Sequence, residues 1–231
     1  AAHASYGLAF GVGVATGHTP HALGGHVLCD VLIHFDEDET PIAETLAAIE
    51  QLTKSGKIRH FGLSNESSWG TMRFIVESEK GTGPRAATIQ NAYNLVNRTF
   101  EVNLAEVCGR EDVSLLAYSP LAQGYLTGKY DHGKRPEGSR SQLFNRGQRY
   151  ETPNAAETQL AYNDLAREFG LEPAQFANAF VHSRPFVASN IIGATSLEQL
   201  DTALRSAEIE WTAEMQAAVD AIHQRSGNPC P

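Results

Sequence analysis

The sequence has few cysteines, no excess of positive charge and no long hydrophobic run. Its three cysteines are far apart and form no Cys-x-x-Cys pair. This argues against a disulfide framework and predicts buried or incidental thiols in a reducing, cytoplasmic compartment. The formal net charge is −9, which argues against nucleic acid as a partner, since duplex binding needs a clustered basic face. No apolar run reaches the ~18 residues that a membrane span requires.

Positive charge is also missing from the front of the chain, where no Lys or Arg precedes Lys54. Without a basic n-region, a secretory signal is unsupported. His18, His21 and His26 have no Cys or carboxylate among them, so a glycine-rich tail is favoured over a metal site and no metal ligand is predicted. We therefore expect an atypical Gly/Ala/His-rich segment over residues 1–26 and one domain over residues 27–231.

The remaining sequence alternates between apolar strands and amphipathic helices. With 231 residues and 42% hydrophobic residues, the chain suits one domain with a sizeable core. Alternation with short connections predicts a parallel sheet with helices outside. The predicted strands cover residues 27–35, 58–63, 87–90, 113–118 and 187–192, and residues 8–16 are a weaker candidate. Five strands predict an incomplete (β/α)8 barrel, about the last five βα units, whose open edges favour self-association.

Polar side chains recur where the predicted strands end. Ser64-Asn65, Gln90-Asn91 and Tyr118-Ser119 each follow an apolar strand. In α/β barrels the carboxyl ends of the strands carry the ligand site. Each group alone also fits a simpler interpretation: Ser64 and Asn65 as a helix-capping turn, and Tyr118 as a core residue. Gln90 is different, because a glutamine that ends a buried strand needs a hydrogen-bonding partner.

Four ordered motifs carry a resemblance to a known family. They are GKIR with GLSN (56–59, 62–65), QNAYN (90–94), AYSPL with GYLTGKY (117–121, 124–130), and IGAT with QL (192–195, 199–200). The chain resembles the aldo-keto reductases over residues 27–225, and within them the Tas-like and potassium-channel β-subunit-like branch. The resemblance implies NADP(H) lying extended across the mouth of the barrel, with a small carbonyl compound as substrate.

The resemblance also implies a role for each polar group. The side chains implied to hold the nicotinamide carboxamide are Ser64, Asn65 and Gln90, and Tyr118 is implied to stack on the ring. The residues implied to lie along the phosphates are Ser119, Leu121, Gln123, Gly124, Lys129 and Arg140. Those implied to contact the 2′-phosphate and adenosine are Gly193, Thr195 and Gln199. Taken alone, Lys129 and Arg140 also fit solvated surface charges. Ala203 stands where the family has an asparagine that bonds adenine, so we expect weaker binding of the adenine.

The catalytic residues match only in part. His34 matches the family histidine that orients the carbonyl, although a strand-end histidine bonded locally is an equal alternative. The family's Asp, Tyr and Lys come from the first part of the barrel, and no Lys precedes His34 here. Tyr6 is a poor candidate for the Tyr, because Ala1 stands where the Asp is expected. We therefore expect a truncated barrel with an incomplete catalytic tetrad. Three hypotheses remain open: a carbonyl reductase, a non-catalytic NADPH-binding or interaction module, and a non-functional remnant.

Overall fold

The computed structural model describes residues 30–34, 40–144 and 148–230. Within them, five strands form one sheet in the order β1-β2-β3-β4-β5, and every neighbouring pair is parallel. The strands are β1 (Asp30–His34), β2 (His60–Ser64), β3 (Thr88–Ala92), β4 (Ser114–Tyr118) and β5 (Val187–Ile191). Parallel strands in sequence order, each joined to the next through helices, are the arrangement of a partial (β/α)8 barrel. The predicted fold class is confirmed.

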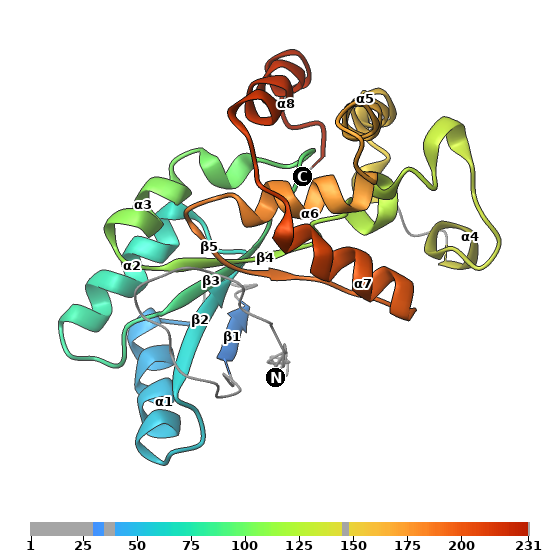
Figure 1. The fold of residues 1–231 in the computed structure, drawn as a ribbon. Coiled ribbons are helices and arrows are strands. Elements are labelled where there is room, and N and C mark those ends of the chain that lie inside the picture. The colour runs from blue at the N-terminus through green and yellow to red at the C-terminus, as the bar shows by residue number, and fades with distance from the viewer. Residues whose placement is uncertain (1–29, 35–39, 145–147, 231) are drawn as a thin grey trace.

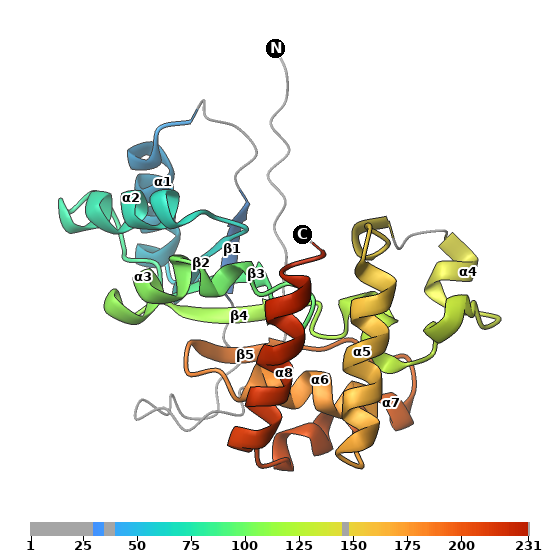
Figure 2. The ribbon, with the colours of Figure 1, turned by 90° about the horizontal axis from the view of Figure 1, so that it is seen from above.

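Eight α-helices connect or follow these strands among the described residues. They are α1 (Ile42–Lys54), α2 (Ser68–Glu79), α3 (Leu104–Arg110), α4 (Arg140–Phe144), α5 (Ala155–Glu168), α6 (Pro173–His182), α7 (Leu197–Arg205) and α8 (Ala213–Ser226). Figure 1 shows α1, α2 and α3 along one flank of the sheet, while α5 to α8 gather beside β4 and β5. Seen from above, α4 stands apart from that group at the outer edge of the molecule (Figure 2).

Local capping explains where several helices begin and end. Ser67, Ser196 and Thr212 each accept a hydrogen bond from the backbone N–H three residues later, as expected for helix caps. Gly56 follows the end of α1 with a φ of +71°, a conformation that glycine adopts without strain. Pro41 is the N-cap of α1, with an extended ψ of 132°, and the helix begins at the next residue.

Two stretches combine short helical segments with turns. Between β3 and β4, the 3-10 turn Thr99–Glu101 is separated from α3 because Asn103 takes a left-handed φ of 68°. The long connection over residues 121–150 is not irregular throughout, since it contains three 3-10 segments and α4. The candidate strand over 8–16 and the division at residue 26 fall outside the described residues and stay predictions.

The core lies between the sheet and its helices. In β4, Leu115 and Ala117 are buried and alternate with half-buried Ser114, Leu116 and Tyr118. Phe61 and Leu63 of β2 belong to the same hydrophobic cluster. Among the described strands, β1 and β5 each pair with only one neighbour, so the sheet has two open edges. Self-association through these edges stays a prediction.

The cysteines that the structure describes are buried and unbridged. Burial raises the pKa of the Cys108 thiol to about 11, and it also raises the pKa of Cys230. Both thiols are therefore protonated and unreactive near neutral pH. In the described part of the chain, no helix is both long and apolar enough to cross a membrane, and no three His, Cys, Asp or Glu side chains are grouped as metal ligands would be.

A network of charges ties α8 to the loop after β3. Asp220 accepts hydrogen bonds from Arg98 Nη1 at 2.8 Å and from Gln216 Nε2 at 2.9 Å. Although partial burial opposes the change, the bonds from Gln216 and Arg98 lower the pKa of Asp220. A carboxyl with a lowered folded-state pKa stabilises the fold above its unfolded pKa, and this stabilisation is lost as the pH falls.

We predict that Asp220→Asn removes this acid-sensitive contribution to stability. The wild-type free energy of unfolding should exceed that of the variant near neutral pH. The difference should shrink as the pH falls from about 4, the unfolded pKa of an aspartate, through the lower folded pKa. Urea denaturation at a series of pH values measures it. A difference that stays constant with pH would show that the variant acts through packing instead.

Candidate functional site

The parallel register brings the predicted carboxamide residues to one edge of the sheet. Ser64 pairs with His34 in β1 and with Gln90 in β3, so the three residues form a row across neighbouring strands. The Asn65 N–H donates to the Gln90 carbonyl at 2.9 Å, which continues the pairing one residue past β2. Only the backbone of His34 is described, so its proposed contact with a carbonyl stays a prediction.

A direct side-chain contact joins Asn65 to Tyr118 across the edge of the sheet. The Tyr118 hydroxyl donates to Asn65 Oδ1 at 2.8 Å. Asn65 has a left-handed φ of 54°, a conformation that asparagine tolerates better than most residues. The cap of α2 is Ser67, so the alternative that Ser64 and Asn65 only cap that helix is wrong. Tyr118 is half-buried and not a core residue. The structure therefore brings the side chains of Asn65 and Tyr118 together and places the backbone of Gln90 beside Asn65. The prediction that Gln90 ends its strand is wrong, because β3 continues for two residues to Ala92.

The loop after β4 is a tight turn built from left-handed residues. The φ angles are 56° at Ser119, 57° at Gln123 and 103° at Gly124. Asn94 Nδ2 donates to the Ser119 carbonyl at 2.9 Å and holds the turn against the loop after β3. Within the turn, the Ala122 N–H donates to the Ser119 carbonyl at 2.9 Å and the Gly124 N–H donates to the Leu121 carbonyl at 2.7 Å, so backbone hydrogen bonds hold its shape. Half-buried Leu121 packs on the core below.

Lys129 folds back over this turn. A Cβ at Gly124 would lie 2.7 Å from Lys129 Cε and 2.9 Å from its Nζ, so no larger side chain fits there as the loop stands. The exposed ammonium also lies 5.0 Å from the Tyr130 ring centroid. The structure thus places a cation next to the glycine turn. The Arg140 side chain lies outside the described side chains, so its predicted contact with phosphate stays a prediction.

The third predicted group lies at the start of α7. Tyr118 pairs with Ile191, so Gly193 follows β5 at the same edge of the sheet. The Thr195 N–H and hydroxyl both donate to Gln199 Oε1, at 2.9 and 3.1 Å. A Cβ on Gly193 would meet nothing within 4 Å, so there is open space beside its backbone. Ala203 is buried and offers no polar atom beyond its backbone.

Arg149 is the residue at this edge that the sequence analysis missed. Its Nη1 donates to the Tyr118 hydroxyl at 3.2 Å, and its guanidinium lies 5.8 Å from the Tyr118 ring centroid. It comes from the short segment Gln148–Tyr150, 31 residues along the chain from Tyr118. In the sequence, the connection over residues 121–150 is long and contains several basic residues, which is typical of a functional loop but does not indicate one residue.

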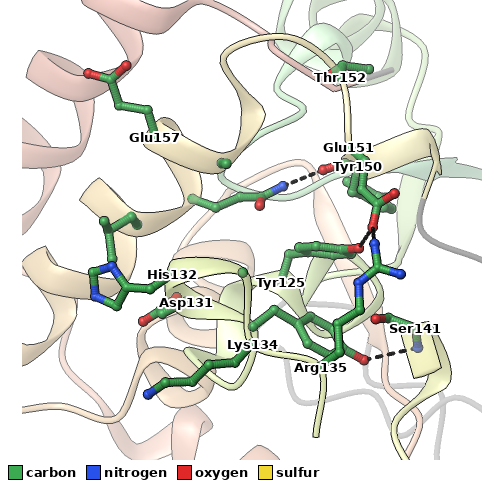
Figure 3. Close-up of a pocket in the computed structure, with 15 residues that line it drawn as sticks. Tyr125, Asp131, His132, Lys134, Arg135, Ser141, Tyr150, Glu151, Thr152 and Glu157 are labelled. Atoms are coloured by element: carbon green, nitrogen blue, oxygen red, sulfur yellow. Dashed lines mark hydrogen bonds and ion pairs between the residues drawn. The ribbon is translucent and has the colours of Figure 1, made fainter.

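A separate pocket of about 460 Å³ lies between the connection after β4 and the first turns of α5 (Figure 3). Its lining includes Tyr125, Tyr130, His132 and Glu157. None of the site residues predicted from the sequence lines it. Polar groups in its wall are already paired, since the Tyr125 hydroxyl and Arg135 both bond Glu151 (Figure 3). The pocket is therefore distinct from the predicted site at the strand ends.

The strand-end residues suit a nicotinamide dinucleotide on chemical grounds. Gln90 is half-buried, and its side-chain amide has no hydrogen-bonding partner among the described residues. An amide offers both a donor and an acceptor, as a carboxamide requires. Lys129 beside Gly124 offers a cation to a phosphate group, and the open space at Gly193 admits a bulky group. These residues fit the cofactor implied by the resemblance.

A sheet of parallel strands in sequence order, joined through helices, defines a partial (β/α)8-barrel protein. A model of the aldo/keto reductase family matches residues 30–224, and the chain belongs to this family. It is 46% identical over 190 residues to "Protein tas" of Escherichia coli (strain K12), covering 82% of this chain and 55% of that protein.

Two further relatives show the range of the family. The chain is 36% identical over 171 residues to an "Aldo-keto reductase" of Babesia bovis, covering 71% of this chain and 60% of the relative. It is 30% identical over 194 residues to "L-glyceraldehyde 3-phosphate reductase" of Escherichia coli O157:H7, covering 81% and 56%. The chain therefore spans about half the length of the curated relatives it matches.

Proposed function

We propose that the chain is an NADP(H)-dependent oxidoreductase that acts on the carbonyl group of a small molecule. The observation that carries the proposal is the convergence of Asn65, Gln90 and Tyr118 at the carboxyl edge of the sheet. Membership of the aldo/keto reductase family supports the same class of chemistry. A relative named for reducing L-glyceraldehyde 3-phosphate supports a carbonyl substrate.

Each group of residues has a defined task in this proposal. Ser64, Asn65 and Gln90 hold the nicotinamide carboxamide and fix the orientation of the ring. Tyr118 covers one face of the ring, so hydride transfer is restricted to the other. The turn at Ser119, Leu121, Gln123 and Gly124, with Lys129 and Arg140, neutralises the phosphates, while Gly193, Thr195 and Gln199 contact the adenosine end. When bound, the cofactor supplies the hydride.

Proton transfer to the carbonyl oxygen is the other part of the reaction. In the proposal His34 orients that oxygen beside the ring, and general acid catalysis contributes typically about 10² to 10⁴ in rate. The second candidate function is a module that binds NADPH without turnover. The observation that favours it is that the side-chain contact at the strand ends joins Asn65 to Tyr118, two residues proposed to hold the cofactor.

A fluorescence titration with NADPH, followed by a turnover assay, tests the proposal and separates the two candidates. We expect saturable binding, seen as a change in nicotinamide fluorescence. Oxidation of NADPH by any aldehyde of a broad panel supports the oxidoreductase, and binding without turnover supports the non-catalytic module. Absence of saturable binding by a folded chain would contradict both. Sedimentation of the same samples tests the predicted self-association.

A further inference from the structure

We propose that Arg149 selects carbonyl substrates that carry an oxyanion, a carboxylate or a phosphate. This rests on the proposed function and names the substrate class of that same site. The guanidinium is 3.2 Å from the Tyr118 hydroxyl, at the end of the site where the nicotinamide ring is expected. A guanidinium presents a planar fork of N–H donors that matches a carboxylate or phosphate in a bidentate manner.

The structure holds the segment that carries Arg149 on several sides. Tyr150 is buried, and its carbonyl accepts from Gln159 Nε2 at 2.7 Å. Its hydroxyl accepts from Asn94 Nδ2 at 3.4 Å. The next two residues are also fixed: Glu151 bonds the Tyr125 hydroxyl, and the Thr152 hydroxyl bonds the Pro229 carbonyl. Because its neighbours fix the backbone of this segment, Arg149 loses less conformational entropy on binding a ligand than an arginine on an unrestrained loop would.

Arg149 makes its contacts at the carboxamide end of the proposed site. It bonds Tyr118, whose hydroxyl bonds Asn65. Its segment, Gln148–Tyr150, also packs against the glycine turn, so the cofactor phosphates are the competing ligand that the test must exclude. In the proposed function the carbonyl substrate lies beside the nicotinamide ring. The Arg149 guanidinium at this end would therefore lie near the substrate. The chain as a whole carries a formal charge of −9, so an anionic substrate needs a local cation at the site.

The test compares binding of two probes of the same shape, benzoate and neutral benzamide, to the full chain with saturating NADPH. Isothermal titration calorimetry gives the dissociation constants. We expect benzoate to bind more tightly than benzamide to the wild type. Arg149→Gln should weaken benzoate by about tenfold or more, because it removes a charge-assisted hydrogen bond. Benzamide should be unaffected. Arg149→Lys should retain part of the preference, and phenyl phosphate should follow benzoate if the site accepts either oxyanion.

The control is Arg110→Gln, which removes an exposed arginine on α3 that pairs with nearby Glu106. It should leave both dissociation constants unchanged. Equal benzoate affinity in the wild type and Arg149→Gln, or an equal loss for benzoate and benzamide, would overturn the inference.

Comparing NADPH with NADH shows whether the anion that Arg149 binds belongs to the substrate or is the 2′-phosphate of the cofactor. If Arg149→Gln lowers affinity for NADPH but not for NADH, the residue binds the cofactor 2′-phosphate and the inference is wrong. If the wild type does not bind NADPH at all, the proposed function fails instead. Normal NADPH binding without a preference for benzoate over benzamide contradicts this inference alone.

Discussion

Replacing Arg98 by Ala should destabilise the protein by about 3–5 kcal/mol, the range for removing one partner of a buried ion pair. The arginine is 6% exposed, and its guanidinium donates to both carboxylate oxygens of Glu101 and to Asp220, each at 2.8 Å. Its backbone N–H donates to Asn228 Oδ1 at 2.6 Å. One side chain therefore links the loop after β3 to α8 and the segment behind it.

The loss of unfolding free energy depends on how well water solvates the two carboxylates once the arginine is removed. The side chains of Glu101 and Asp220 are 27% and 39% exposed, so water can partly replace the arginine and the result should lie toward the lower end of the range. Chemical denaturation gives the free energy of unfolding. The matched variant Arg110→Ala removes a pair whose side chains are 76% and 66% exposed, and it should change stability by less than about 1 kcal/mol. Similar losses in both variants would contradict a central role for Arg98.

Replacing Gln90 by Ala should weaken NADPH binding by roughly ten- to a hundredfold. The amide is proposed to make two hydrogen bonds with the carboxamide, each worth about 0.5–1.5 kcal/mol net. Because the side chain has no partner among the described residues, the melting temperature should hardly change. His34→Ala should weaken binding less, since the histidine is proposed to face the carbonyl substrate. Fluorescence titration of each variant measures the dissociation constants.

A distant glutamine provides the control for this series. Gln51 is exposed on α1, away from the strand ends, so Gln51→Ala should leave NADPH affinity unchanged. Equal affinities for Gln90→Ala and His34→Ala would argue that the carboxamide is held elsewhere. Loss of affinity in all three variants would indicate an effect on folding rather than on the site.

The sequence predicted those features that depend on neighbours along the chain. Strands were found as short apolar runs, and the caps at Ser67, Ser196 and Thr212 follow from local hydrogen bonding. The strand-end residues were found because parallel strands of a barrel place their carboxyl ends at one edge. Asn65 and Tyr118 are 53 residues apart, and this rule together with the family resemblance predicted that they share one site.

Features that depend on distant partners could not be predicted in the same way. Arg98 meets Asp220 across 122 residues, and nothing in either local sequence indicates the pair. Arg149 looks like any surface arginine until the fold places it beside Tyr118. The break before α3 depends on one left-handed asparagine, Asn103, which a helical pattern of apolar residues does not reveal. These features depend on the tertiary fold or on one backbone conformation, and the periodicity of apolar residues does not indicate either.

The central claim is that the carboxyl ends of β2, β3 and β4 form the site for the nicotinamide cofactor. Titration of the ¹⁵N-labelled chain with NADPH, followed by nuclear magnetic resonance, tests it most directly. We predict saturable shifts of the side-chain amides of Asn65 and Gln90 and of the Tyr118 and Gly124 backbone amides. Gly133 and Ala156, in the pocket of Figure 3, should not shift. Shifts confined to Gly133 and Ala156, or no saturable shift at the strand ends, would contradict the claim.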